Sequence, residues 1–298
     1  MGINANEAAA ILALKRAGQV GGEILCLGRP ELFVGRRELQ RLNTAFELNL
    51  SSKEVRQVSR ERFADAFLER CGFAKVISLD ASAYEGASIV HDLNLPVPPE
   101  LEGQAGFLYD GGTAEHVFDV AEVLGNVTKL LRVGGVALIS CAANGQCGHG
   151  FYQFSPELFY RFFEANGFVD VRVYLFGLMR PSRWFLATDP RSLRKRIQFM
   201  TSEPVQALVV ARKAEELLNL VVPLQSDYAD LQWHARPEEI ARAHAVWHTA
   251  GARWRSGLRD RIVYPISVLS RHMFGVGMPA LWRRSQFRPL DPFIDALM

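Results

Sequence analysis

A series of short apolar segments, separated from one another by charged or helical stretches, constrains the fold of this chain more than any other feature. The segments end at Leu27, Asp80, Asp92, Asp110 and Ala142. Apolar runs of this length that alternate with helical patterns are typical of βαβ units. We therefore expect an open, largely parallel α/β sheet.

Helical patterns fill much of the chain between these segments. The expected helices are 5–18, 51–72, 113–131 and 155–166. A serine cap with Glu54 begins the second of them, and Ser155-Pro156 begins the fourth, as capping preferences predict. Two later segments, 168–176 and 205–213, are expected to pair as strands.

The pattern changes near residue 214, which predicts two parts: an α/β domain over 1–214 and a helical extension over 215–298. The extension contains no convincing strand, and residues 236–256 read as a helix rich in Arg, His and Trp. Its basic and aromatic residues favour a cap over the site or a homodimer contact. Contact with an anionic membrane surface is the weaker alternative.

Composition argues against several classes of protein. The chain of 298 residues has a formal net charge of +2, with 49% hydrophobic and 22% charged residues, as in ordinary soluble proteins. This charge gives no reason to expect a nucleic-acid partner. The four cysteines are scattered, and Cys147 near His149 lacks the further ligands of a zinc site, so no metal is expected. Without a leader pattern or an apolar run of about 20 residues, a cytoplasmic location is the default expectation.

Three consecutive strand candidates end in an aspartate: Asp80, Asp92 and Asp110. In open α/β sheets, ligands bind outside the carboxyl ends of the strands. We expect at least two of these carboxylates to line a pocket there. The alternative is that each one merely caps the turn that follows it.

The segment "GFLYDGGTAEHVFDVAEVLGNVTKLLRVGGVALISCAA" carries the most specific pattern in the chain. Asp110 ends a strand, Glu115-His116-Val117 follows, and a Gly-Gly turn at 134–135 precedes the fifth strand. This order resembles the class I S-adenosylmethionine-dependent methyltransferases, and the resemblance covers residues 20–212. It implies a Rossmann-like fold and S-adenosylmethionine as the cofactor, with Asp110 lining the pocket.

The same resemblance assigns roles to the earlier acids. Asp80 matches the acid that holds the ribose hydroxyls, and a carboxylate can accept hydrogen bonds from both of them. Asp92 and Leu93 match the residues that flank the adenine.

The first turn departs from the family pattern of an acid followed by three alternating glycines. The chain has Gly28 and then Arg29-Pro30. Glycines there let the backbone approach the cofactor closely, whereas proline fixes φ and removes a donor. Arg29 could pair with the methionine carboxylate or could fill the pocket, and both alternatives stay open.

The loop after the fifth strand, "CAANGQCGHGFYQF", supplies the catalytic candidates. Methyl transfer needs an aligned acceptor and the removal of a proton, and imidazole titrates near neutral pH. His149 and His116 are therefore the candidate bases, with capping or packing as the alternative. Tyr152, Gln153 and Tyr228 are candidate substrate contacts, although Tyr228 could belong to a linker.

The expected function is S-adenosylmethionine-dependent methyl transfer to an oxygen or nitrogen of a small polar metabolite or saccharide. The main alternative is a non-catalytic methyltransferase-like binding or scaffold protein that has lost the cofactor. A third alternative keeps the pocket for another nucleotide-containing ligand.

Overall fold

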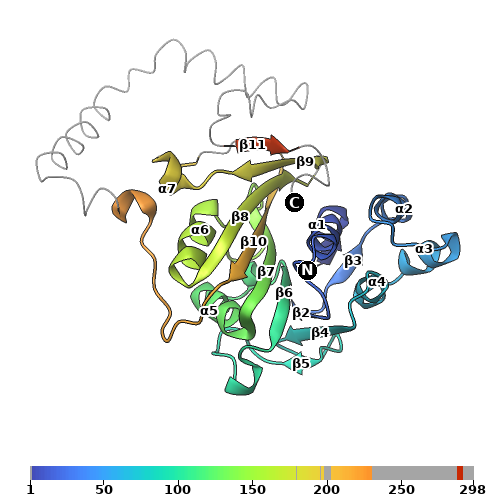
Figure 1. Cartoon of the computed structure of the whole chain (residues 1–298), viewed down its shortest axis with the longest axis horizontal. Helices are drawn as coiled ribbons and strands as arrows, with labels where there is room; N and C mark the ends of the chain where they lie inside the picture. The colour runs from blue at the N-terminus through green and yellow to red at the C-terminus, as the bar shows by residue number, and fades with distance from the viewer. Residues whose placement is uncertain (1, 179, 195, 198–202, 230–286, 291–298) are drawn as a thin grey trace, which may run out of the picture.

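The computed structural model describes residues 2–178, 180–194, 196–197, 203–229 and 287–290. Its centre is a twisted nine-stranded sheet with the order β11-β9-β8-β10-β7-β6-β2-β4-β5 (Figure 1). The strands are β2 Glu23–Leu27, β4 Lys75–Asp80, β5 Ile89–Val90, β6 Ala105–Gly111, β7 Leu131–Asn144, β8 Phe168–Gly177, β9 Arg180–Ala187, β10 Val205–Lys213 and β11 Phe287–Leu290.

Strand directions confirm the expected α/β class. Strands β5, β4, β2, β6 and β7 run parallel to one another, and β10 lies antiparallel between β7 and β8. The predicted pairing of 168–176 with 205–213 is confirmed, with Leu208 opposite Tyr174. The first strand of this sheet along the chain, β2, is a central strand, and the order reverses beside it. Such a switch point is where ligands bind in open α/β sheets.

Helices cover both faces of the sheet (Figure 1). They are α1 Ala5–Arg16, α2 Arg36–Ala45, α3 Ser52–Val58, α4 Asp65–Arg70, α5 Val120–Leu130, α6 Pro156–Ala165 and α7 Pro190–Leu193, with 3-10 turns η1 Pro99–Leu101 and η2 Ala114–His116. Side chains alternate along β6, so that Phe107 and Tyr109 enter the core under α1, whereas Leu108 enters the core under α5 and α6. The three-layer arrangement buries both sides of each parallel strand, which explains their nearly continuous apolar sequence.

Helix α1 begins at a capping box in which Asn4 and Glu7 exchange hydrogen bonds. A small strand β1 (Gly2–Asn4) precedes the helix and pairs in parallel with β3 (Glu31–Phe33). The hydroxyl of Tyr109 donates to the carbonyl of Gly2 over 2.9 Å. The N-terminal segment therefore lies against the carboxyl end of β6.

Two helices expected to be continuous are broken. The stretch 51–72 forms α3 and α4, because the chain between them bonds to the segment after β2: the amide of Leu32 donates to Arg62, and the amide of Ala64 donates to Pro30. The stretch 113–131 forms η2 and then α5. Asp119 caps α5 by accepting from the amide of Glu122 over 3.1 Å, which fixes a new helix start.

Four strands were not expected from the sequence: the short pair β1 and β3, and the strands β9 and β11 of the main sheet. Strand β9 pairs antiparallel with β8, and β11 extends the sheet by pairing with β9, so the expectation of no strand beyond 214 is wrong. The expected helix 236–256 and the basic aromatic residues near it lie outside the described residues. Within the described part of the chain, no helix combines the length and the hydropathy needed to cross a bilayer.

Candidate active site

The carboxyl ends of β2, β4 and β6 are tied together by short hydrogen bonds. The amide of Gly28 donates to the carbonyl of Leu79 over 2.6 Å, and the hydroxyl of Thr113 donates to the carbonyl of Leu27 over 2.6 Å. Gly28 has φ +71°, a left-handed conformation that suits glycine. These bonds fix the edge of the sheet at which the sequence places the cofactor.

Asp80 and Asp92 lie at this edge, after the parallel strands β4 and β5. Oδ1 of Asp80, which is partly exposed, accepts from the amide of Ser82 over 3.1 Å. Asp92 is exposed, and its Oδ1 accepts from the backbone and side-chain N–H groups of Asn94 over 2.9 and 2.8 Å, which lowers the pKa of this carboxyl. Leu93 is buried. Both carboxylates remain within reach of solvent and of a ligand.

Asp110 differs from the other two because it is fully buried. Its carboxylate accepts from the backbone amides of Gly112, Thr113 and Ala114. Burial, with a contribution from the charge of Glu115, raises the pKa of Asp110 to about 7. Asp110 thus holds the loop after β6 in place. Its carboxylate is bonded to backbone amides and does not face solvent.

Arg29, in the unusual turn after β2, has partners on three sides. Its Nε lies 3.3 Å from Oδ2 of Asp65, and its Nη1 donates to the carbonyl of Glu85 over 2.7 Å. The guanidinium also lies 4.2 Å from the centre of the Phe63 ring. To bind the carboxylate of a methionine group, Arg29 would have to do so while it keeps its hydrogen bond to Glu85, or it would have to break that bond.

A cluster of Glu115, His116 and His149 lies beyond the ends of β6 and β7. Nε2 of His149 is 3.5 Å from Oε1 of Glu115, and the two imidazole rings meet edge to face at 4.8 Å. The Glu115 side chain is fully buried, whereas both histidines are exposed. A buried carboxylate beside an exposed imidazole can orient the ring.

Backbone geometry holds these two loops together. The amide of Phe151 donates to the carbonyl of Glu115 over 2.6 Å. Gly150 has φ +73°, and a Cβ at this position would lie 2.5 Å from the same carbonyl oxygen. Only glycine permits this approach, which sets His149 against Glu115.

Three buried acids in and near the cluster have raised pKa values: Glu7, Asp110 and Glu115. Burial raises the pKa of Glu7 to about 7, although Ser140 donates to its carboxylate over 2.6 Å. Burial likewise raises the pKa of Glu115. In the described part of the chain, no Lys or Arg pairs with any of the three. A cation bound near these carboxyl groups would favour their ionised forms.

Burial also lowers the pKa of His116, and the neighbouring His149 lowers it further. Both effects favour the neutral imidazole, which can accept a proton or bind a metal ion.

Two exposed phenyl rings border the cluster. Phe118 is 72% exposed and Phe151 is 65% exposed, and the rings meet edge to face at 5.9 Å. The hydroxyl of Tyr152 donates to the carbonyl of Phe118 over 2.7 Å, which joins the two loops again. Exposed large apolar side chains next to polar reactive groups are typical of a ligand site.

The other candidate substrate residues have structural partners. Oε1 of Gln153 accepts from the amide of Gln146 over 2.8 Å within the loop after β7. Tyr228 is half exposed in the helical segment 226–229, which docks on α6 through Ser226 and Glu157. Their roles as substrate contacts stay predictions.

Sequence reasoning missed Phe118, Phe151 and Glu7. Phe118 and Phe151 each stand two residues after a candidate histidine, a spacing that could have indicated a shared rim. Glu7 gave no signal beyond that of an ordinary acid in the first turn of a helix.

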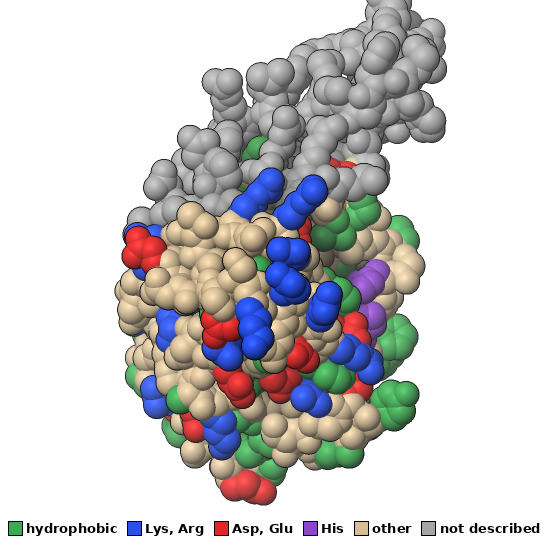
Figure 2. Space-filling view, turned by 90° about the vertical axis from the view of Figure 1, so that its right-hand side faces the viewer, with side chains coloured by type: hydrophobic (Ala, Val, Ile, Leu, Met, Phe, Trp, Pro, Cys, Tyr) green, Lys and Arg blue, Asp and Glu red, His purple; other side chains and the backbone are tan. Residues whose placement is uncertain are grey.

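The surface is mixed in charge where Figure 2 views it, with Lys and Arg interspersed among Asp and Glu. Histidine side chains reach the surface at one margin of this face, beside hydrophobic ones. The absence of a continuous basic face in this view agrees with the small net charge.

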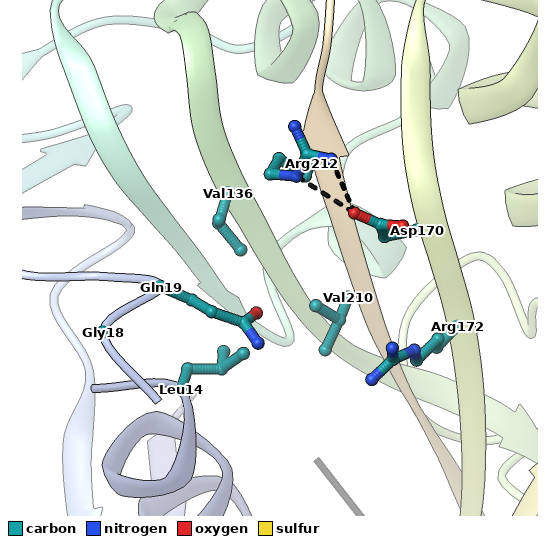
Figure 3. A pocket seen from close by; sticks show the side chains of 8 residues that line it. All are labelled: Leu14, Gly18, Gln19, Val136, Asp170, Arg172, Val210 and Arg212. Atoms are coloured by element: carbon teal, nitrogen blue, oxygen red, sulfur yellow. Dashed lines mark hydrogen bonds and ion pairs between the residues drawn. The ribbon is translucent and has the colours of Figure 1, made fainter. Parts of the chain in front are cut away.

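A cavity of about 390 Å³ lies at the opposite end of the parallel strands, between the end of α1 and the strands β7, β8 and β10 (Figure 3). Arg212 pairs with Asp170 there over 2.7 Å, and Arg172 and Gln19 point into the space. Because the carboxyl ends of β2, β4 and β6 lie at the other end, this cavity is distinct from the cluster.

No family model matches the sequence, and no curated protein does. Among solved structures, 1,6-didemethyltoxoflavin-N1-methyltransferase from Burkholderia thailandensis, with S-adenosylhomocysteine bound, is similar at 18% identity and a TM-score of 0.34, over 71% of this chain and 79% of that one. A phosphoethanolamine N-methyltransferase from Haemonchus contortus, also with S-adenosylhomocysteine, has 12% identity and a TM-score of 0.38, over 69% of this chain and 52% of that one.

A branched-chain polyamine synthase from Thermus thermophilus, with 5'-methylthioadenosine bound, is similar at 15% identity and a TM-score of 0.38, over 74% of this chain and 60% of that one. The chain thus spans little more than half the length of the second and third of these proteins. Since the TM-scores are low, the fold assignment rests on the strand order of the chain itself. That order defines a Rossmann-like α/β fold of the methyltransferase type.

Proposed function

We propose that this protein binds S-adenosylmethionine at the carboxyl ends of β2, β4 and β6 and transfers its methyl group to a small molecule. The observation that carries the proposal is the pairing of Glu115 with His149 over 3.5 Å at this edge of a methyltransferase-type sheet. The carboxyl ends of the strands, where ligands bind in such sheets, would then lie beside the Glu115–His149 pair.

The residues at the edge fit most of the cofactor. Asp80 would accept from the ribose hydroxyls, and Asp92 with Leu93 would border the adenine, because these residues follow β4 and β5. The buried acids, with no Lys or Arg partner among the described residues, suit a positively charged sulfonium.

The turn at Gly28 and Arg29 fits less well, because Arg29 is already held by Asp65 and Glu85. We propose that it borders the cofactor by fixing the loop after β4. Asp110 would contribute by holding the loop after β6 in place.

His149 is the proposed base, and Glu115 is its positioning residue. When bound, S-adenosylmethionine supplies an activated methyl group, so the protein must align the acceptor and remove one proton. His149 is about half exposed, so an acceptor can reach its ring, and the buried carboxylate of Glu115 lies 3.5 Å from Nε2 and would orient the imidazole. His116, the second candidate, has its ring edge against His149 and no described carboxylate contact of its own at this distance.

We propose an oxygen or nitrogen atom as the acceptor. The expected polar metabolite or saccharide would meet Tyr152 and Gln153, but the exposed rings of Phe118 and Phe151 favour a molecule with a flat or apolar body. The acceptor atom would then point toward His149 while the body rests on the rings.

The test is a turnover assay with methyl-labelled S-adenosylmethionine and separate pools of phenols, amines and saccharides. We expect label transfer to a phenol or amine, a loss of about 10²–10⁴-fold in His149→Ala, and unchanged cofactor binding in that variant. The pair Phe118→Ala and Phe151→Ala should raise KM with little effect on cofactor affinity. Transfer that His149→Ala does not slow would contradict the proposed base.

A non-catalytic binding protein is the second candidate function, and Arg29 is the observation that favours it. A guanidinium that fills the first turn would exclude the methionine part of the cofactor. No binding of S-adenosylmethionine by the folded protein would support this alternative.

A further inference from the structure

We propose that Glu115, His116 and His149 form a binding site for one divalent transition-metal ion, with zinc as the representative ion. This inference goes beyond methyl transfer and does not depend on it. One ligand atom from each residue lies within 4.8 Å of the other two. Two imidazoles with one carboxylate are a ligand set that zinc and ferrous ions both take in catalytic sites.

The three ligand atoms lie close to the spacing that a bound metal ion requires. Two ligands at about 2.1 Å from a tetrahedral metal ion lie about 3.4 Å apart. Nε2 of His149 and Oε1 of Glu115 are already 3.5 Å apart. The three ligand atoms lie within 4.8 Å of one another, so a rotation of the exposed His116 side chain has to bring its ring nitrogen closer by up to about 1.4 Å to match this spacing.

The carboxylate provides an independent indication of a missing partner. Oε2 of Glu115 is buried, and no hydrogen-bond partner for it occurs in the described part of the chain. An ionised oxygen buried without a partner is costly, and a bound cation would remove that cost.

The arrangement corresponds to a metal site that has a free coordination position. The buried carboxylate lies beneath two exposed imidazoles, so three protein ligands occupy one side of the ion. The solvent side is left for water or for an acceptor oxygen. Nε2 of His149 cannot bind the ion and take up a proton at once. With the ion bound, the acceptor would be activated by a lowered pKa of its hydroxyl.

The experiment is calorimetric titration of the metal-free full-length protein with ZnCl₂, followed by Co²⁺ titration with visible absorption as a second readout. The variants are His116→Asn and His149→Asn, whose exposed side chains can be exchanged without disturbing the core, and Glu115→Gln. The matched control is His91→Asn, since His91 contacts the carbonyl of Leu95 and lies outside the cluster.

We expect about one ion per chain, a loss of affinity of roughly tenfold or more in each cluster variant, and no change in His91→Asn. Absence of binding, or affinity that His116→Asn and His149→Asn leave unchanged, would overturn the site. Titration of the metal-free protein with S-adenosylhomocysteine is scored separately. It can therefore fail or succeed independently of the metal result.

Discussion

Arg29 donates to the carbonyl of Glu85 over 2.7 Å and so ties the turn after β2 to the loop after β4. The same guanidinium reaches Asp65 at the start of α4 and stacks on Phe63. A residue of the turn that departs from the expected glycine pattern thus joins three segments near the proposed ribose site. Arg29 therefore stabilises the loops at the carboxyl ends of β2 and β4, whether or not it also binds a ligand.

Replacing Arg29 with Met should destabilise the protein by about 1–3 kcal/mol, because a partly buried charged donor is lost and Asp65 is left without it. Denaturant unfolding measures the change, with Arg36→Met on exposed α2 as the control. If Arg29 only blocks the pocket, the variant will instead bind S-adenosylmethionine more tightly with no loss of stability.

Gly150→Ala should displace the loop after β7, because a Cβ there meets the carbonyl of Glu115 at 2.5 Å and the backbone has φ +73°. We expect a loss of about 1–3 kcal/mol and weaker activity. Gly148→Ala is the matched control, since nothing lies within 4 Å of its added Cβ. Equal effects of the two substitutions on thermal unfolding would show that the close approach does not position His149.

Glu7 predicts a pH dependence of stability. Its pKa rises from 4.5 to about 7 on folding, so the folded state holds a proton that the unfolded state releases between these values. Stability should therefore fall as pH rises from 5 to 7, by on the order of 3 kcal/mol for this group, and level off above. Asp110, raised to about 7, acts in the same direction.

The measurement is denaturant unfolding between pH 5 and 8. Glu7→Gln removes the titrating group while its amide oxygen can still accept from the amide of Asn4, so it should reduce the fall and stabilise the protein at pH 8. Glu61→Gln, at an exposed position, should leave the profile unchanged. A Glu7→Gln profile as steep as that of the wild type would contradict the assignment.

Local patterns made the sheet predictable. Apolar runs and glycine boundaries located β2, β4, β6, β7, β8 and β10 and placed Asp80 at a strand end. They could not show the breaks in 51–72 and 113–131, because these arise from bonds to Pro30 and from the Asp119 cap. Strand β9 was missed because its place is set by pairing with β8, which is tertiary information.

In the candidate site, too, local patterns predicted some features, whereas others depend on tertiary contacts. The histidines could be identified by residue type and loop position, and His149 and His116 do lie together. The partner of Glu115 could not be derived, because its contact with His149 depends on Gly150 approaching the Glu115 carbonyl across two loops. The burial of Asp110 and the contacts of Arg29 also depend on three-dimensional packing.

Cofactor binding at the carboxyl edge is the central claim, and calorimetric titration with S-adenosylmethionine and S-adenosylhomocysteine tests it most directly. Asp80→Asn is the site variant, and Asp170→Asn at the opposite edge is the matched control, since asparagine tolerates its φ of +56°. We predict binding by wild type and Asp170→Asn, and affinity weaker by roughly tenfold or more in Asp80→Asn, because charge-assisted bonds to the ribose are lost. Absence of binding by the folded wild type, or equal affinity in both variants, would contradict the account.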